Sequence, residues 1–252
     1  MKARACGIVA LAILAGGCSI VQTGHGKGHW SYSGKTGPEH WGDLSPEYVL
    51  AKTGKRQSPI DIANPKPFKA PPLNFRYKTT ALNVVNNGHA IQQDCDEGSV
   101  LEVGGATYAL KQFHFHGLSE HTVNGKHYAM EGHLVHQDAK GTLAVVGFFL
   151  VRGKENAFLK PLFDRMPAKP GERVKDAGVK LNIIDLLPSK RSYYAYDGSL
   201  TTPPCSEGVN WSVLCEPIEM SPGQLEQFRK LYANNYRPVQ PLNGREVVKV
   251  EP

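Results

Sequence analysis

Two strand-like runs joined by a tight turn decide the fold of this chain, in which residues 112–136 read QFHFHGLSEHTVNGKHYAMEGHLVH. Asn124-Gly125 supplies the positive φ angles that a two-residue type I′ hairpin requires, so we expect antiparallel strands on either side. Alternate side chains of a strand point to opposite faces, so His114 and His116 share one face. The stretch therefore predicts a hairpin that carries two imidazoles on one surface.

The turn also predicts which residues face each other. An antiparallel ladder keeps the sum of paired residue numbers constant, so pairing of Val123 with Lys126 places His133 directly opposite His116. This expectation holds for an unbroken ladder, and a bulge within residues 117–119 shifts the register by one. In either case a third imidazole is expected to join the first two.

Three neutral imidazoles around an open position are the ligand set of a catalytic zinc ion, whereas structural zinc sites use four ligands rich in cysteine. The chain has no Cys-x-x-Cys pair. With no carboxylate among its ligands, the metal keeps its full charge and strongly acidifies a bound water. The residues therefore predict a zinc site, formed by His114, His116 and His133, that generates a nucleophile at neutral pH.

Seven segments, taken in order, resemble the α-class carbonic anhydrases: GPEHW (37–41), QSPIDI (57–62), NNGH (86–89), QFHFH (112–116), SEHTV (119–123), SLTTPP (199–204) and NYRPVQPL (235–242). The likeness runs from about Trp30 to Arg245. It implies a mainly β (α+β) single domain with a large, mostly antiparallel twisted central sheet, a few short peripheral helices and zinc at the bottom of a conical cavity. The implied reaction is reversible hydration of carbon dioxide to bicarbonate and a proton, by attack of zinc-bound hydroxide.

The resemblance also assigns roles to polar residues. It implies that Gln112 and Glu131 accept hydrogen bonds from the first and third ligand histidines, and that the backbone carbonyl of Gly244 accepts one from the second. Thr201 is implied to accept the proton of the zinc-bound hydroxide. Its own hydroxyl hydrogen is then committed to Glu120, because an ionised carboxylate is an acceptor only.

A proton path and a substrate pocket are implied in the same way. His89 is the implied proton shuttle, because an imidazole titrates at about 6.5 and both accepts and releases protons near neutral pH. Tyr32 and Asn87 are implied to order the intervening waters. The implied receptor for carbon dioxide consists of Val135, Val145, Leu200, Thr202, Val209 and Trp211.

The first residues indicate export. A basic start is followed by an apolar run at residues 8–15, which is too short to span a bilayer. We therefore expect a signal peptide at residues 1–17, a flexible segment or lipoprotein tether at 18–28 and the catalytic domain at 29–252. Ala15-Gly16-Gly17-Cys18 resembles a bacterial lipoprotein box, so one alternative is membrane attachment through a lipidated Cys18. The other is ordinary cleavage, which leaves a free periplasmic or secreted protein.

Charge and length bear on the partners and the domain count of the protein. The formal net charge of +6 falls to +4 when Lys2 and Arg4 leave with the signal, and the remaining basic residues are scattered, so a nucleic-acid partner is not indicated. At 252 residues the chain suits one large domain. A homodimer is one assembly that the sequence leaves open.

The cysteines depart from the resemblance. Many bacterial members pair the cysteine after Thr-Thr-Pro-Pro, here Cys205, with a position that Ala51 occupies in this chain. The usual bridge therefore cannot form. Cys95, Cys205 and Cys215 remain in the expected mature domain, so at least one is unpaired whichever two join.

Strand patterns dominate the body of the chain, and helices are expected to be few. Ser221-Pro222 supplies an N-cap and a first-turn proline for a helix through residues 224–232, and residues 154–163 are a second candidate. The expected strands are residues 82–85, 100–103, 111–116, 129–136, 143–151 and 209–214. Two other functions stay open: a catalytically weak zinc- or ligand-binding lipoprotein of the same fold, and esterase activity as a side reaction.

Overall fold

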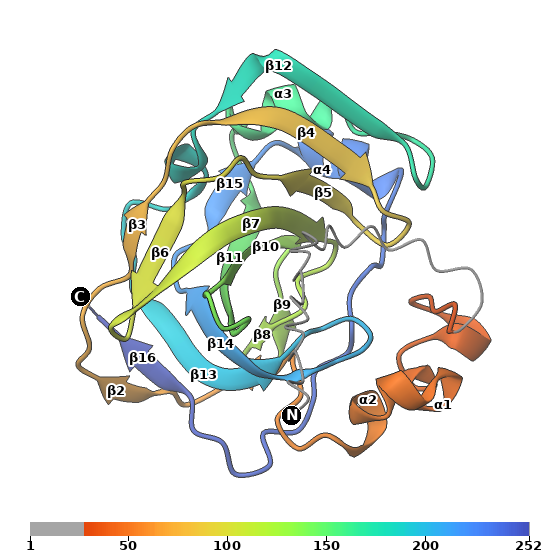
Figure 1. Ribbon diagram of the computed structural model, residues 1–252, viewed down its shortest axis with the longest axis vertical. Coiled ribbons are helices and arrows are strands. Elements are labelled where there is room, and N and C mark those ends of the chain that lie inside the picture. Colours follow the sequence, from red (N-terminus) through yellow and green to blue (C-terminus); the bar gives the residue numbers. More distant parts are fainter. Residues whose placement is uncertain (1–27, 252) are drawn as a thin grey trace, which may run out of the picture.

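The computed structural model describes residues 28–251, and a large twisted sheet forms its centre (Figure 1). The main path of the sheet has the order β12-β4-β5-β7-β10-β11-β14-β13-β16-β2. Its strands are β2 (Lys66–Phe68), β4 (Thr80–Asn86), β5 (Ile91–Asp94), β7 (Ala106–His116), β10 (Met130–Gln137), β11 (Leu143–Arg152), β12 (Arg173–Leu181), β13 (Tyr193–Ser199), β14 (Glu207–Leu214) and β16 (Val248–Val250). Off this path, β3 (Asn74–Arg76) pairs with β6 (Val100–Val103), β6 pairs with β7, and β15 (Ile218–Met220) pairs with β11.

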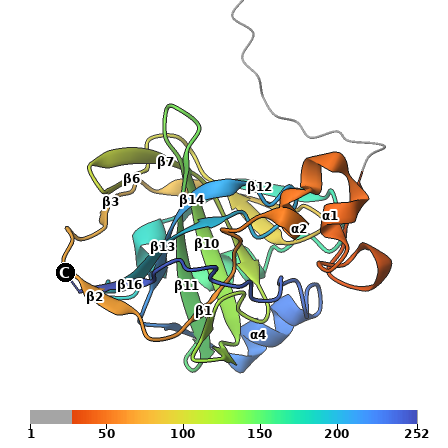
Figure 2. The same cartoon turned by 90° about the horizontal axis from the view of Figure 1, so that it is seen from below.

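Helices lie at the periphery, with α1 and α2 on the opposite side of the molecule from β2 and the C-terminus (Figure 2). The α-helices are α1 (Trp41–Leu44), α2 (Leu50–Thr53), α3 (Leu159–Phe163) and α4 (Pro222–Arg229), and the 3-10 helices are η1 (Gly34–Thr36), η2 (Pro46–Tyr48) and η3 (Ile183–Leu186). A small second sheet contains β1 (Asp61–Ile62), β8 (Thr122–Val123) and β9 (Lys126–His127). Among the described helices, none is long and apolar enough to cross a membrane.

The expected fold class is confirmed, although the sheet is mixed. Most neighbouring strands are antiparallel, while β14 and β15 run parallel to β11 and β2 runs parallel to β16. Strand β11 is buried along almost its whole length and reads as a continuous hydrophobic run. A strand covered on both faces is expected to have this composition.

Alternation along the central strands separates two hydrophobic clusters. On β11, Val146 and Phe148 belong to the larger cluster, whereas Val145 and Phe149 belong to the smaller one. On β7, Phe113 and Phe115 are fully buried in the larger cluster, so His114 and His116 face the other way. The imidazoles therefore lie on the face that carries the smaller cluster.

The predicted register across the hairpin is wrong, although the turn itself is correct. Val123 pairs with Lys126 as predicted, but His133 lies opposite His114, and Glu131 lies opposite His116. The ladder is interrupted because the chain leaves β7 after His116, and the turn belongs to the separate sheet with β1. The interruption shifts the pairing by two residues rather than the one expected from a single bulge.

The predicted helix after Ser221 is present, but it ends at Arg229, three residues before the predicted end. The Ser221 hydroxyl accepts from the Gln224 N–H, and the Gln224 side chain accepts from the Ser221 N–H, which forms a capping box. The candidate helix at 154–163 is limited to α3. Its first half is not helical because the Asn156 carboxamide accepts the N–H groups of Phe158 (3.1 Å) and Leu159 (3.2 Å), which caps the chain at that point. The predicted signal peptide, lipidated Cys18 and most of the tether lie outside the described residues.

Candidate metal centre and active site

Three histidines from two adjacent strands meet as predicted. His114 and His116 project from β7, and His133 projects from β10. The ring centroids of His116 and His133 are 4.6 Å apart, and those of His114 are 5.0 Å and 5.2 Å from the other two. The residues offer ligand atoms that all lie within 4.8 Å of one another.

Each ligand histidine has one ring nitrogen committed to a protein acceptor. His114 Nδ1 donates to Gln112 Oε1 (2.8 Å), and His133 Nε2 donates to Glu131 Oε1 (2.9 Å), as the sequence predicted. Such bonds fix the tautomer and leave the opposite nitrogen with a lone pair. The remaining nitrogens are Nε2 of His114 and Nδ1 of His133.

The acceptor for His116 was predicted incorrectly. His116 Nδ1 donates to the backbone carbonyl of Asn235 (2.7 Å), not to that of Gly244. Asn235 is held against the end of β7 by three bonds. Its N–H donates to Gly117 O (3.1 Å), its Nδ2 donates to Phe115 O (3.0 Å) and its Oδ1 accepts from Gly117 N (2.9 Å). The 235–242 segment was noted in the sequence without a role for this residue, and only the tertiary contact reveals it.

The histidine set fits a metal ion. His116 Nε2 is buried and has no hydrogen-bond partner in the described chain, and an unpaired buried polar atom is costly. Burial lowers the pKa of His114 and of His116, and repulsion from the neighbouring imidazoles adds to this lowering. These two rings are therefore neutral at physiological pH, which is the form that binds a metal.

A second group, His121, Glu131 and His133, also lies within metal-ligand range, but hydrogen bonds account for it. His121 Nδ1 donates to Glu131 Oε1 (2.7 Å), and His121 Nε2 contacts the Tyr196 hydroxyl (2.6 Å), which in turn contacts Ser58 Oγ (2.8 Å). Burial by itself would raise the pKa of Glu131, but attraction to His121 and His133 outweighs it and lowers the pKa. The group is a buried polar network behind the metal ligands, and the sequence reasoning missed it.

Glu120 is fully buried beside the ligands, and its contacts differ from those predicted. Its Oε1 accepts from the backbone N–H of Arg237 (2.8 Å), and its unpartnered Oε2 lies 3.6 Å from His116 Nε2. Within residues 28–251 no hydrogen bond joins Thr201 to Glu120, because one carboxylate oxygen is occupied and the other faces the imidazoles. Thr201 itself is buried, with 5% of its surface exposed.

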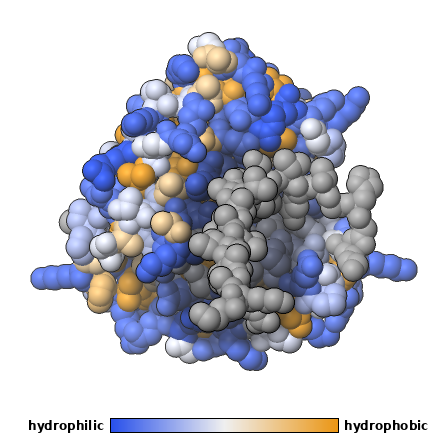
Figure 3. All heavy atoms as spheres, viewed as in Figure 1, coloured by the Kyte–Doolittle hydropathy of each residue, from blue (hydrophilic) through white to orange (hydrophobic). Residues whose placement is uncertain are grey.

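A cavity of about 800 Å³ opens over the histidines. Besides His114 and His116, five residues with a predicted role line it: Tyr32, Asn87, His89, Gln112 and Thr202. Trp30 and Gln92 also line it, and neither has a predicted role. Hydrophilic residues cover most of the visible face of the molecule, with hydrophobic ones scattered among them (Figure 3). The Tyr32 hydroxyl is buried and has no hydrogen-bond partner among residues 28–251, and burial raises its pKa.

His89 is placed near the cavity by its own loop. The Asn87 carboxamide oxygen accepts from the N–H groups of His89 (2.9 Å) and Ala90 (2.8 Å), so Asn87 shapes the loop as well as lining the cavity. The His89 ring stacks on Trp30 at a centroid distance of 3.6 Å. Burial, with a smaller contribution from His29, lowers the pKa of His89 to about 4.

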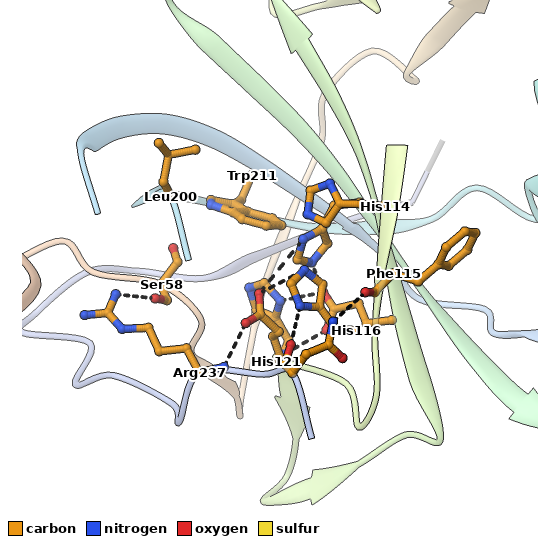
Figure 4. Close-up of polar contacts among 12 residues, drawn as sticks. Ser58, His114, Phe115, His116, His121, Leu200, Trp211 and Arg237 are labelled. Atoms are coloured by element: carbon orange, nitrogen blue, oxygen red, sulfur yellow. Dashed lines mark hydrogen bonds and ion pairs between the residues drawn. The ribbon is translucent and has the colours of Figure 1, made fainter. Parts of the chain in front are cut away.

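The predicted apolar receptor is one continuous patch. Val145, Val209 and Trp211 are buried members of the smaller hydrophobic cluster, and Val135 and Leu200 pack against it. The Trp211 ring lies 4.9 Å from that of His133, and Figure 4 shows it beside His114, on the side of Leu200. Thr202 is separate from this patch and lines the cavity.

The described part of the chain contains three cysteines, and all are free: Cys95, Cys205 and Cys215. Burial raises the pKa of Cys205 to about 11, so its thiol is protonated at neutral pH.

Three convergent imidazoles beside a polar cavity and an apolar cluster form a site that could hold a metal ion. A sequence model of the eukaryotic-type carbonic anhydrases matches residues 36–251. The chain belongs to this family, and it is a carbonic anhydrase of the α class.

Known relatives agree with this membership. The carbonic anhydrase of Nostoc sp. is 43% identical over 226 residues, which cover 88% of this chain and 86% of that protein. The carbonic anhydrase of Klebsiella pneumoniae is 44% identical over 224 residues, covering 88% and 91%. The solved α-carbonic anhydrase of Thermovibrio ammonificans, in complex with the inhibitor sulfanilamide, has a TM-score of 0.86 and 51% identity, covering 88% of this chain and all of that one.

Proposed function

We propose that this protein hydrates carbon dioxide reversibly to bicarbonate and a proton, with zinc held by His114, His116 and His133. The observation that carries the proposal is that each imidazole has one nitrogen committed to a protein acceptor and the other available for a metal. When bound, zinc lowers the pKa of a coordinated water, an effect for which carbonic anhydrases are the reference example.

The surrounding residues bind and orient the reactants. Carbon dioxide is apolar, so the patch around Val145 and Trp211 binds it next to the histidines and excludes water from that side. Glu120 Oε2 has no hydrogen-bond partner among the described residues, and it would be the acceptor for the Thr201 hydroxyl hydrogen in the zinc-loaded protein. The Thr201 oxygen would then be left to accept a hydrogen bond and orient the attacking group.

His89 carries the released proton from the cavity to solvent. Tyr32 and Asn87 lie on the cavity wall with it and order the water between them. In its stack on Trp30 the imidazole is neutral at pH 7, but a pKa of about 4 makes it a weak proton acceptor there. We therefore propose that the ring accepts the proton when it leaves the stack, because exposure to solvent returns its pKa toward the ordinary histidine value.

The test is stopped-flow carbon dioxide hydration by the zinc-loaded protein and by His116→Ala, with zinc content measured for both. His116→Ala is expected to lose zinc and at least about a hundredfold of kcat/KM, because it removes a ligand. His127→Ala, which changes an exposed histidine outside the site, serves as the control and is expected to keep both. An inactive zinc-loaded parent would contradict the proposal.

The alternative of a zinc- or ligand-binding protein without useful turnover is not favoured, because all three ligand histidines lie within metal-ligand range of one another and two of them line the cavity. Esterase activity remains a proposed side reaction of the same nucleophile. We also propose export to the periplasm or beyond, with lipidation of Cys18 and homodimer formation as open proposals. The intact mass of the exported protein and its mass in solution test these two points.

A further inference from the structure

Arg237 is a buried cation that the proposed reaction does not use directly. Only 1% of its surface is exposed, and it is among the largest fully buried side chains. Its Nη1 donates to Gln57 Oε1 and to Ser58 O, both at 2.8 Å, and its Nη2 donates to Ala51 O (3.0 Å). The guanidinium carbon lies 5.6 Å from the centroid of the Trp41 ring. All of these acceptors are neutral oxygens, so no carboxylate contacts the guanidinium directly. Burying a positive charge without such a partner costs free energy.

Gln57 and Ser58, the residues that the guanidinium holds, fix both ends of the loop at residues 200–204. At one end, Ser58 N donates to Ser199 Oγ (2.8 Å) and Ser199 N donates to Ser58 Oγ (3.0 Å). At the other end, Gln57 Nε2 donates to Cys205 O (3.0 Å). The loop between these anchors carries Thr201. Figure 4 shows Arg237 reaching toward Ser58 from the segment that passes beneath the histidines.

Arg237 also contacts Glu120, the residue that is proposed to act together with Thr201. The backbone N–H of Arg237 donates to Glu120 Oε1 (2.8 Å), and this bond leaves Oε2 directed toward His116. The positive guanidinium and the buried Glu120 carboxylate attract each other electrostatically. One residue thus contacts the carboxylate through its backbone and the anchors of the Thr201 loop through its side chain.

We propose that the Arg237 guanidinium is a positioning residue, which holds the loop at residues 200–204 so that Thr201 meets Glu120 at the metal site. The inference rests on the proposed function, because it assigns Thr201 and Glu120 their roles there. The planar fork of arginine reaches three acceptors in fixed directions, whereas a lysine ammonium is a point charge on a flexible stem. Keeping the charge while removing the fork therefore separates geometry from electrostatics.

The experiment compares the zinc-loaded parent, Arg237→Lys, Thr201→Ala and the double variant by the kcat/KM of carbon dioxide hydration. Arg237→Lys is expected to lower kcat/KM by about tenfold or more, because small misplacements of catalytic groups are costly. In the Thr201→Ala background the same change is expected to cost less than about threefold, because the two residues act through one contact. Arg191→Lys, another guanidinium over an aromatic ring, here Phe75 at 5.2 Å, is the matched control and is expected to keep the parental rate.

Amide hydrogen exchange supplies a readout that does not depend on activity. Arg237→Lys is expected to speed exchange at Ser58, Ser199 and Leu200 while the strands β7 and β10 stay protected. Ser58→Ala, which removes one anchor and keeps Arg237, is expected to speed exchange at Ser199 and Leu200 as well, and this variant serves if Arg237→Lys does not fold.

Two results would overturn the positioning role: unchanged exchange at Ser58, Ser199 and Leu200 in Arg237→Lys, or equal costs of Arg237→Lys with and without Thr201. Failure of the proposed function looks different, since Thr201→Ala would then leave the parental rate intact. The exchange data would still decide whether the guanidinium holds the loop.

Discussion

At the scale of single residues, the hydrogen bond made by one ring nitrogen of each ligand histidine determines whether the other nitrogen is available to bind a metal. His114, His116 and His133 each donate one N–H to an acceptor, and these bonds select the nitrogens available to a metal. His89 shows the same dependence on surroundings. The His89 ring stacks on Trp30, and burial lowers its pKa from the ordinary histidine value to about 4.

Replacing Trp30 with alanine is expected to raise the pKa of His89 from about 4 toward the ordinary histidine value near 6.5. Burial is the larger cause of the lowering, and the substitution exposes the ring. A pH titration of the His89 imidazole by NMR measures the shift. His29→Ala removes only the smaller, electrostatic cause and is expected to produce a smaller rise, and an equal or larger rise there would contradict this ranking.

At the scale of elements, β7 and β10 form the frame that brings the ligands together. Both strands alternate, with the three ligand imidazoles on one face and core residues on the other, and the pairing of His133 with His114 places these two ligands across a single ladder. Gly132 lies between Glu131 and His133 at a point where the next layer is very close. A Cβ atom added there would lie 2.2 Å from Phe148 Cζ.

Gly132→Ala is therefore expected to destabilise the fold by about 1 to 3 kcal/mol, since Phe148 or the strand must move to relieve the overlap. Because the strand carries Glu131 and His133, we also expect weaker zinc binding. Urea unfolding and zinc titration measure the two effects. Gly223→Ala in α4 is the control, because its Cβ meets nothing closer than 3.8 Å and alanine favours a helix. If Gly132→Ala has the parental free energy of unfolding, the overlap with Phe148 is relieved at no cost and the prediction is wrong.

At the scale of the whole molecule, buried ionisable groups make stability depend on pH. His136 is fully buried on β10; its Nδ1 donates to Ala144 O (3.1 Å) and its Nε2 lies 2.6 Å from the Tyr77 hydroxyl. Burial lowers the pKa of His136 to about 4. The unfolded chain therefore takes up a proton at a higher pH than the folded one, so stability is lost as the pH falls below about 6.5.

The contribution of His136 to this loss is expected to be about 3 kcal/mol between pH 6.5 and pH 4. His136→Gln removes the titrating group and is expected to flatten the stability curve over that range, at some cost in stability at pH 8 from the altered hydrogen bonds. Urea unfolding at a series of pH values gives both quantities. His127→Gln changes an exposed histidine and is expected to leave the slope as it is, and an unchanged slope in His136→Gln would refute the assignment.

The sequence by itself determined the local features and the residue types of the site. Strand alternation placed His114 and His116 on one face, Asn124-Gly125 specified the turn, and Ser221 to Gln224 specified the cap of α4, because each signal depends on residues close in sequence. The ligand trio followed from spacing, and the motifs named the family. These predictions required no knowledge of how distant segments meet.

Only the tertiary structure decided the partners that come from far along the chain. The carbonyl that accepts from His116 belongs to Asn235 rather than Gly244, and the register of His133 follows from a ladder that breaks after His116. The Arg237 contacts join residues more than a hundred positions apart. Backbone carbonyls carry no sequence signature, and the path of a loop is set by packing against other segments, so neither is legible in the local pattern.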